Sequence, residues 1–449
     1  MKTPLVAIVG RPNVGKSSLF NLLAGSRISI VADTAGITRD RIYAPVEWSG
    51  VTFTLVDTGG VDFDEGNAFA AHIREQVDIA IDLADVIIFA VDGEAGLAPT
   101  DSDIANMLRK SKKPIVLAVG KLDNDRREMN ELYDFYKLKV GDPIPISCTQ
   151  KRGIGDLLDA VIGHMGTRDP EQNDADQSGS VRVAIVGKPN AGKSSIVNRL
   201  LGEKRVMVSE IAGTTRDSID TPFRYDGRDF ILTDTAGIRR KRSVEVQTIE
   251  HYAVLRGLAA IRNSDVSVLV VDAVEGLTEQ DVRLAGYIND EGKPSVIVIN
   301  KWDIVTENEN LRTKDEGKSH IFLEYNKLLD RDLAFMPYYK AVFISALTGQ
   351  RMGEIMRTVD MVLGNWRKRV TTGKLNQLFF DFAAVNPTRA KIKYATQVAT
   401  CPPTFAVFVS KKEFLPPTYM RYLENSLRKS VDFSGTPIRL LIRDSGGEK

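Results

Sequence analysis

Two stretches of the chain carry residues that suit phosphate binding. Both match the pattern G-x-x-x-x-G-K-[ST]. Glycines let backbone N–H groups turn toward phosphate oxygens, and the start of a following helix adds partial positive charge. The lysine would bring charge to the terminal phosphates, and the serine after it a hydroxyl for Mg²⁺. The two predicted phosphate loops are Gly10, Arg11, Pro12, Asn13, Val14, Gly15, Lys16 and Ser17, and Gly187, Lys188, Pro189, Asn190, Ala191, Gly192, Lys193 and Ser194.

Further polar residues follow each loop at matching positions. The intervals between Lys16 and Lys193, between Thr38 and Thr215, and between Asp57 and Asp234 are identical, which indicates a duplicated domain. We expect the threonines and aspartates to join the Mg²⁺ shells with Ser17 and Ser194, and the lysines and threonines to act in catalysis. Each aspartate begins a short segment that we expect to contact the bound nucleotide. The two segments are Asp57, Thr58, Gly59 and Gly60, and Asp234, Thr235, Ala236, Gly237 and Ile238.

A third set of residues suits recognition of a purine base. A carboxylate at Asp123 or Asp303 can accept hydrogen bonds from guanine N1–H and its exocyclic amine, a donor pair that adenine lacks. A loop that begins with a serine after the last strand of each copy would line the base. These residues are Gly120, Lys121, Leu122, Asp123, Ser147 and Cys148 in the first copy, and Asn300, Lys301, Trp302, Asp303, Ser345 and Ala346 in the second.

The elements that must position these residues are buried strands and the helices between them. Leu5–Val9 and Val181–Val186 are short apolar runs before the phosphate loops. Val86–Val91 and Pro114–Val119 have no polar alternation, which is typical of parallel strands covered on both faces. The sequence therefore predicts an α/β fold in each copy, with a mostly parallel sheet and helices on both faces. The interval between the copies grows after Asp303, so we expect an insertion near residues 305–339 in the second copy.

The C-terminal part has a different pattern. Its predicted order is α-β-β-α-β, a small α+β domain, and basic residues outnumber acidic ones there. The first helix carries Leu375, Leu378, Phe379 and Phe382 at helical spacing. The first strand, Ala390–Ala399, is expected to alternate, with a basic outer face formed by Lys391 and Lys393. Its other face would carry Ile392, Tyr394, Thr396 and Val398.

Length and composition agree with several ordinary domains. The chain has 449 residues, a formal net charge of +1 and 43% hydrophobic residues, and it contains two cysteines. This balance gives no global attraction to nucleic acid, and no apolar run is long enough to span a bilayer. With so few cysteines and no signal peptide, we expect a cytoplasmic protein. We expect four parts: residues 1–165, the first copy; 166–180, an acidic polar linker; 181–365, the second copy; and 366–449, the C-terminal domain.

The ordered motifs resemble those of the translation-factor-related GTPases. The chain has two such copies followed by the C-terminal domain, which contains Pro402–Phe405 and Tyr419–Asn425. In this order of parts the whole chain resembles the bacterial double-G-domain GTPases, the Der or EngA family. That resemblance implies two P-loop G-domains followed by a K-homology-like (KH-like) domain. It also implies binding of GTP or GDP with Mg²⁺ and GTP hydrolysis at two sites. The implied partner is the assembling large (50S) ribosomal subunit or its RNA, without a membrane, for a chain expected to be a monomer.

Two features of the loops resemble the potassium-activated branch of these GTPases. Val61 and Ile238 stand where many GTPases have a water-orienting glutamine. Asn13 and Asn190, by resemblance, would help to bind K⁺ beside the phosphates. Arg39 or Arg216 could supply the positive charge instead.

The first copy departs from the family pattern at Gly120, where the family has an asparagine that ties the base loop to the phosphate loop. This difference keeps open an alternative, a nucleotide-gated RNA-binding module with a slow regulatory first site. A tRNA-modification or membrane GTPase of the same branch is a further alternative. Arg239–Arg242 is either a solvated charge run or a switch segment that reaches RNA or another domain.

Overall fold

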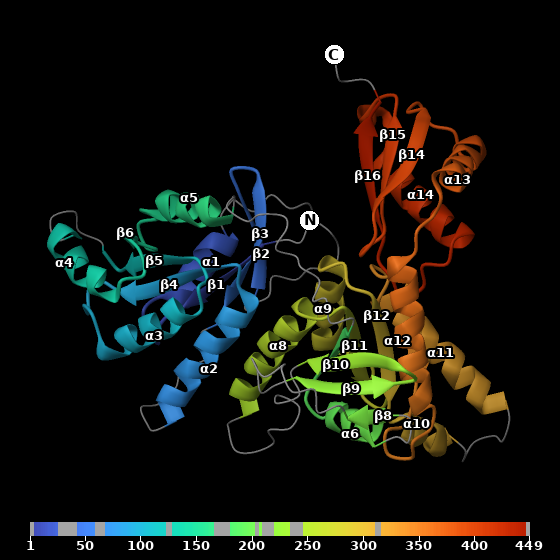
Figure 1. Ribbon diagram of the computed structural model, residues 1–449, viewed down its shortest axis with the longest axis horizontal. Helices are drawn as coiled ribbons and strands as arrows, with labels where there is room; N and C mark the ends of the chain where they lie inside the picture. Colours follow the sequence, from blue (N-terminus) through green and yellow to red (C-terminus); the bar gives the residue numbers. More distant parts are fainter. Residues whose placement is uncertain are drawn as a thin grey trace. The chain divides into compact units, whose positions relative to one another are not determined.

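The computed structural model describes residues 4–25, 43–58, 68–122, 128–165, 180–202, 206–208, 220–233, 246–309 and 316–445 (Figure 1). The chain divides into two units. One comprises residues 1–177 and 244–259, and the other comprises residues 178–243 and 260–449.

The apolar runs of the first copy form a six-stranded sheet in the order β2-β3-β1-β4-β5-β6. All neighbouring strands are parallel except β2 and β3, which pair antiparallel. Every residue of β1 and of β4 is buried, as expected of strands covered on both faces. The strands are β1 (Leu5–Val9), β2 (Tyr43–Trp48), β3 (Val51–Asp57), β4 (Val86–Asp92), β5 (Ile115–Gly120) and β6 (Pro143–Pro145).

Helices cover both faces of this sheet. Leu19 and Leu23 of α1 and Leu157 and Val161 of α5 join one buried cluster with the strands, so these two helices share a face. Figure 1 shows α2 and α3 on the opposite face. The helical segments are α1 (Lys16–Gly25), α2 (Ala68–Leu83), α3 (Pro99–Lys110), α4 (Glu128–Phe135), η1 (Tyr136–Leu138) and α5 (Ile154–Met165).

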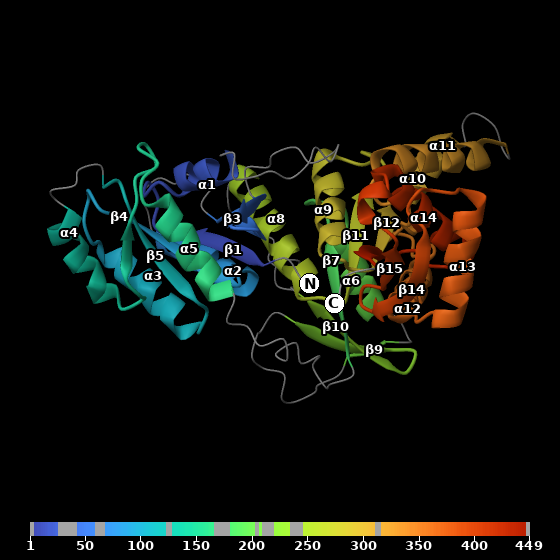
Figure 2. The same ribbon diagram turned by 90° about the horizontal axis from the view of Figure 1, so that it is seen from above.

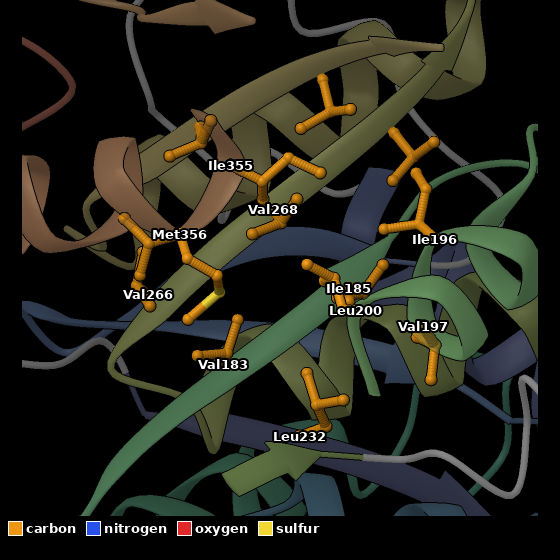
Figure 3. Close-up of a cluster of buried hydrophobic side chains, with 14 of the residues drawn as sticks. Val183, Ile185, Ile196, Val197, Leu200, Leu232, Val266, Val268, Ile355 and Met356 are labelled. Carbon is orange, nitrogen blue, oxygen red and sulfur yellow. The ribbon is translucent and has the colours of Figure 1, made fainter. Parts of the chain in front are cut away.

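The second copy repeats this architecture with a seven-stranded sheet in the order β13-β12-β11-β7-β10-β9-β8. Figure 3 shows how Ile196 and Leu200 of α6 and Ile355 and Met356 of α12 gather over the strand residues, Val268 among them. The strands are β7 (Val181–Val186), β8 (Val206–Val208), β9 (Thr221–Tyr225), β10 (Arg228–Thr233), β11 (Val266–Asp272), β12 (Ser295–Asn300) and β13 (Ala341–Phe343). The helices are α6 (Lys193–Leu201), α8 (Val246–Arg262), α9 (Glu279–Asp290), α10 (Trp302–Glu309), α11 (Glu316–Asp332) and α12 (Met352–Arg367).

The predicted insertion in the second copy contains a helix. In the described residues, α10 and α11 stand between β12 and β13, and α11 lies within the expected range 305–339. The last strand, β13, still pairs parallel with β12, so the insertion leaves the sheet order intact.

The C-terminal part forms a three-stranded sheet in the order β14-β15-β16, and Figure 2 shows it with α13 and α14. Strands β14 and β15 are antiparallel, whereas β15 and β16 are parallel. Phe379 of α13, Phe405 of β15 and Leu423 of α14 are buried in one core, so both helices pack on the same face of the sheet. The elements are α13 (Thr372–Val385), β14 (Ile392–Ala399), β15 (Thr404–Val409), η3 (Lys412–Phe414), α14 (Pro417–Ser430) and β16 (Arg439–Asp444), which confirms the predicted order α-β-β-α-β.

The predicted face of β14 is wrong. Ile392 is buried, but Tyr394 is 44% exposed and Val398 48% exposed, while Ala395 and Gln397 are buried. A register irregularity between Ile392 and Tyr394 is the reason, because one extra residue moves every later side chain to the opposite face.

The predicted fold class is confirmed, and several element bounds agree with the sequence-based ranges. The predicted strands Leu5–Val9 and Val181–Val186 have these same bounds in the structure. None of the described helices combines the length and apolar composition needed to cross a membrane.

Two candidate nucleotide sites

Each predicted phosphate loop connects a strand to a helix. The first leads from β1 into α1, and the second from β7 into α6. Asn13 and Asn190 both have φ +64°, and Gly15 and Gly192 have φ +94° and +98°. The two loops therefore share the same alternation of left-handed residues, which is the backbone shape that turns N–H groups inward.

The first glycine of each loop packs against a neighbouring strand. A Cβ atom at Gly10 would lie 2.2 Å from the carbonyl oxygen of Ala90, and one at Gly187 would lie 2.2 Å from that of Val270. Because those carbonyl oxygens belong to β4 and β11, no side chain fits at either position. The loops are thus held against the carboxyl ends of the central strands.

The loop lysines, Lys16 buried and Lys193 partly buried, turn back onto the loops. Lys16 Nζ donates to the carbonyl oxygen of Arg11 at 2.8 Å. Lys193 Nζ donates to the carbonyl oxygens of Gly187 and Lys188, each at 2.6 Å. Burial lowers the pKa of Lys193 to about 8, although the charge of Asp281 opposes the shift.

Two of the predicted Mg²⁺ ligands of the first site lie together. The hydroxyl of Ser17 donates to Asp57 Oδ2 at 2.9 Å. The hydroxyl of Thr58 donates to the carbonyl oxygen of Ile8 at 2.6 Å, which fixes the chain after β3 against β1. The corresponding predictions for Thr38, Gly59, Gly60, Thr215, Asp234, Thr235, Ala236, Gly237 and Ile238 lie outside the described residues.

In the second copy, one asparagine ties the two ends of the site together. The buried Asn300 Nδ2 donates to the carbonyl oxygen of Ala191 in the phosphate loop at 2.9 Å. Its Oδ1 accepts from the backbone N–H of Ala346 in the base-side loop, also at 2.9 Å. The hydroxyl of Ser345 accepts from the N–H of Thr348 at 3.1 Å and closes that loop.

The lysine of each base motif is held by an aspartate at the end of a central strand. Lys121 pairs with Asp92 at 2.8 Å, and Lys301 pairs with Asp272. Burial alone would raise the pKa values of both aspartates, but the hydrogen bonds from the lysines and from backbone N–H groups outweigh it and lower them. Both carboxylates are therefore ionised at neutral pH and fix the lysine stems beside the base position.

The carboxylate of Asp303 stands in the first turn of α10. Its Oδ1 is buried and has no hydrogen-bond partner among the described residues. The neighbouring Trp302 packs edgewise on Tyr325 and Phe343, with ring centroids 5.4 Å and 4.6 Å apart, and so anchors this turn. Its counterpart in the first copy, Asp123, lies outside the described residues.

Gly120 occupies the position of Asn300 in the first copy. A Cβ atom there would lie 3.4 Å from the carbonyl oxygen of Val14 and 3.5 Å from that of Val91, which are ordinary contacts. The position thus has room for a side chain beside the phosphate loop, but glycine offers no amide. Cys148 is partly buried against the core of its unit. Leu122 is buried at the position where the second copy has Trp302.

Sequence reasoning missed one charged contact at each phosphate loop. Arg11 Nε lies 3.4 Å from Asp101 of α3, and Lys188 pairs with Glu275. Burial raises the pKa of Asp101 and of its counterpart in α9, Asp281. Both aspartates are the third residue of a helix, where the sequence pattern indicates a helix cap. The sequence pattern does not indicate that they lie close to a charged residue of the phosphate loop.

Two family models match the chain. A model described as a 50S ribosome-binding GTPase matches residues 5–121 and again residues 182–301. A model described as the C-terminal KH-domain-like part of EngA bacterial GTPase enzymes matches residues 369–443.

Full-length relatives give the same result. Proteins named GTPase Der from Alkaliphilus oremlandii, Agathobacter rectalis and Clostridium perfringens are 48%, 47% and 49% identical to this chain. The matches cover 100%, 99% and 99% of this chain and the same shares of the relatives.

Proposed function

The chain belongs to the GTPase Der family, and we propose that it uses both of its nucleotide sites to bind and hydrolyse GTP in the assembly of the large ribosomal subunit. GTP hydrolysis is the activity of the family, which also implies GTP or GDP and Mg²⁺ as ligands. The assignment of individual residues, the use of K⁺ and the ribosomal partner are the proposal.

Asp303 in the second site is the observation that supports guanine as the base. Asp303 Oδ1 is buried without a partner among the described residues, and an unpaired buried carboxylate oxygen costs free energy. Guanine N1–H and the exocyclic amine would supply the missing donors, whereas adenine would leave the carboxylate unpaired. Asn300 links the phosphate loop to the base-side loop beside this carboxylate motif. In the first site Asp123 would read the same edge of the base.

The phosphate end of the first site suits a magnesium ion. Ser17 Oγ and Asp57 Oδ2 are 2.9 Å apart and form a pair of hard oxygen donors of the kind that Mg²⁺ takes. The ion would neutralise charge on the β- and γ-phosphates. Ser194 and Asp234 would do the same in the second site, with Thr38 and Thr215 completing the two shells.

The lysines would contribute the charge that the terminal phosphates need. Lys16 and Lys193 hold their ammonium groups over backbone carbonyls of their own loops, at distances of 2.6–2.8 Å. A phosphate oxygen at this position would replace a neutral acceptor with a charged one, which strengthens the hydrogen bond. We propose these lysines as catalytic residues together with Thr38 and Thr215.

Potassium is proposed as the additional cation. Asn13 and Asn190 are exposed at the tips of their loops, and the left-handed backbone at each turns the side chain outward. Asparagine also tolerates this conformation better than most residues, so a purely conformational role is the competing explanation. Replacing K⁺ with Na⁺ separates the two, because only a cation role makes the hydrolysis rate depend on which ion is present.

The ribosomal partner is supported by the family model and by the C-terminal domain. The model that matches both G-domains is described as ribosome-binding, and the KH-domain-like match spans residues 369–443. We propose that the chain works as four parts, residues 1–165, 166–180, 181–365 and 366–449, whose contacts with ribosomal RNA depend on the bound nucleotide.

Co-sedimentation tests the ribosomal part. Full-length protein is incubated with separated large and small subunits, with Mg²⁺ and either GDP or a non-hydrolysable GTP analogue. We expect binding to the large subunit that differs between the two nucleotides. Equal recovery with both subunits, or no binding in either state, would refute the ribosomal role.

The alternative of a regulatory first site has one observation in its favour, namely Gly120 in place of the asparagine. Comparison of Lys16→Ala with Lys193→Ala distinguishes it. Equal losses of turnover indicate two working GTPases, whereas turnover that survives Lys16→Ala indicates a regulatory first site.

A further inference from the structure

An arginine joins the second phosphate-loop helix to the base-side loop. Arg199 stands on α6, which begins at Lys193. Its Nη1 donates to the carbonyl oxygens of Ala346 at 2.9 Å and Leu347 at 2.7 Å, and its Nη2 donates to that of Thr348 at 3.1 Å. One side chain thus binds three consecutive carbonyl oxygens of the loop that would line the guanine.

The next residue of that loop makes room for the arginine. A Cβ atom at Gly349 would lie 2.5 Å from Arg199 Nη2, and the residue has φ +87°. The guanidinium therefore lies directly against the backbone of this glycine. A larger residue at position 349 would displace the arginine and strain the turn.

The first copy carries different residues at all of these positions. Leu22 lies as far along the chain from Lys16 as Arg199 lies from Lys193, and it packs against the apolar core of its unit. Both base-side loops are closed by the same backbone bond, from Ser147 N to Arg152 O at 3.0 Å and from Ser345 N to Gln350 O at 3.2 Å.

This shared closure aligns Gly349 with Lys151, whose φ is +56°. A side chain therefore stands in the first copy where the guanidinium lies in the second. Leu22 cannot donate a hydrogen bond, and Gly120 has no amide to offer. In the second site, Arg199 and Asn300 link the base-side loop to α6 and to the phosphate loop. The residues at these positions in the first site, Leu22 and Gly120, cannot form such side-chain hydrogen bonds.

We propose that Arg199 is a positioning residue that keeps the base-side loop of the second site closed over guanine, and that the first site releases its nucleotide faster. The inference rests on guanine nucleotide binding at both sites. Release of the base requires the loop to open, and in the second site opening breaks bonds from a charged donor as well as those of Asn300. The second site would retain its nucleotide, whereas the nucleotide bound at the first site would change with the ratio of GTP to GDP in solution.

Nucleotide release from the full chain tests the proposal. The protein is loaded with a fluorescent GDP analogue and Mg²⁺, and release is followed after addition of excess GDP. We expect a fast and a slow phase, with the slow phase alone remaining in a Lys16→Ala background. Because hydrogen bonds from a charged donor are among the stronger ones, Arg199→Leu should accelerate the slow phase by roughly tenfold. Leucine is chosen because it is the residue of the first site.

Three controls distinguish positioning from general damage. Asn198→Leu changes the exposed neighbouring residue on the same helix and should leave both phases unchanged. Arg199→Lys keeps the charge but cannot span three carbonyl oxygens, so its slow phase should be intermediate. With saturating GTP, the single-turnover hydrolysis rate of the second site should not change in Arg199→Leu, because the arginine contacts the base-side loop and not the phosphates.

The reciprocal change addresses the first site. Leu22→Arg combined with Gly120→Asn and Lys151→Gly should slow the fast phase severalfold and leave the slow phase as it was. If Arg199→Leu does not change the slow phase, or if the second site releases GDP faster than the first, the inference is wrong while GTP binding stands. If the analogue binds to neither site, the proposed function fails and the inference fails with it.

Discussion

Replacing Asn300 with glycine gives the second site the residue that the first site has at Gly120. It removes the side chain that links the phosphate loop to the base-side loop. Two buried hydrogen bonds are lost, from Nδ2 to Ala191 O and from Ala346 N to Oδ1, both 2.9 Å long. Each such bond contributes about 0.5–1.5 kcal/mol, and a buried backbone group left unpaired costs about 1–3 kcal/mol. The expected loss is roughly 2–4 kcal/mol, or about 30- to 1000-fold in the dissociation constant for GDP.

The assay is a titration of full-length Asn300→Gly with GDP and Mg²⁺ in a Lys16→Ala background, so that only the second site is measured. Urea unfolding with and without GDP accompanies it, because any part of the link made before binding is lost as stability instead. The matched variant is Gly120→Asn, for which the Cβ distances of 3.4 Å and 3.5 Å leave room. It should strengthen GDP binding at the first site by about 0.5–1.5 kcal/mol.

One result would refute this reasoning. If Asn300→Gly leaves GDP affinity within about twofold of the parent and the free energy of unfolding unchanged, the two bonds do not link the loops in solution. The unequal sites would then need a different explanation.

Three other changes have expected outcomes. Because the pKa of Lys193 is about 8 and a bound phosphate favours its charged form, nucleotide binding at the second site should take up a proton and weaken as the pH rises through 8, measured by calorimetry in buffers of different ionisation enthalpy. Asp281→Ala should lower the free energy of unfolding by about 1–3 kcal/mol in urea titrations, because the carboxylate accepts from Thr278 N at 3.1 Å and Thr278 Oγ1 at 2.6 Å; an unchanged value would contradict the capping role. Phe405→Ala should destabilise the C-terminal core by about 3–5 kcal/mol, seen as early unfolding of that part in hydrogen exchange, and the exposed Phe414→Ala should have little effect.

The sequence was most informative where chemistry and local pattern coincide. A phosphate loop needs glycines, a lysine and a serine at fixed spacing between a buried strand and a helix, and both copies have them. Central parallel strands are buried on both faces, so a run such as Val86–Val91 is continuously apolar and easily recognised. The link made by Asn300, and its absence at Gly120, was expected from the resemblance to the family's base motif.

Contacts between distant segments were not predictable from local pattern. Arg199 is an exposed arginine on a helix, and nothing near it in the sequence indicates three carbonyl acceptors around residue 347. The same holds for Arg11 and Asp101, which meet because α3 returns to the loop. Only comparison of the two copies, in which Leu22 takes the place of Arg199, gives a sequence signal for the first of these contacts.

Strand periodicity failed where the backbone is irregular. The alternation in β14 is regular in the sequence, but the register shift after Ile392 exchanges its two faces and exposes Tyr394. An inserted residue leaves no trace in residue type, so the predicted face could be corrected only by the structure.

The stoichiometry and order of GDP binding test the central claim most directly. Full-length protein is titrated with GDP and Mg²⁺ by calorimetry, alongside ADP and the variants Lys16→Ala and Lys193→Ala. Two unequal, guanine-specific sites predict two GDP per chain, with the tighter site lost in Lys193→Ala and the weaker one in Lys16→Ala. A single GDP per chain, comparable binding of ADP, or loss of the tighter site in Lys16→Ala would contradict it.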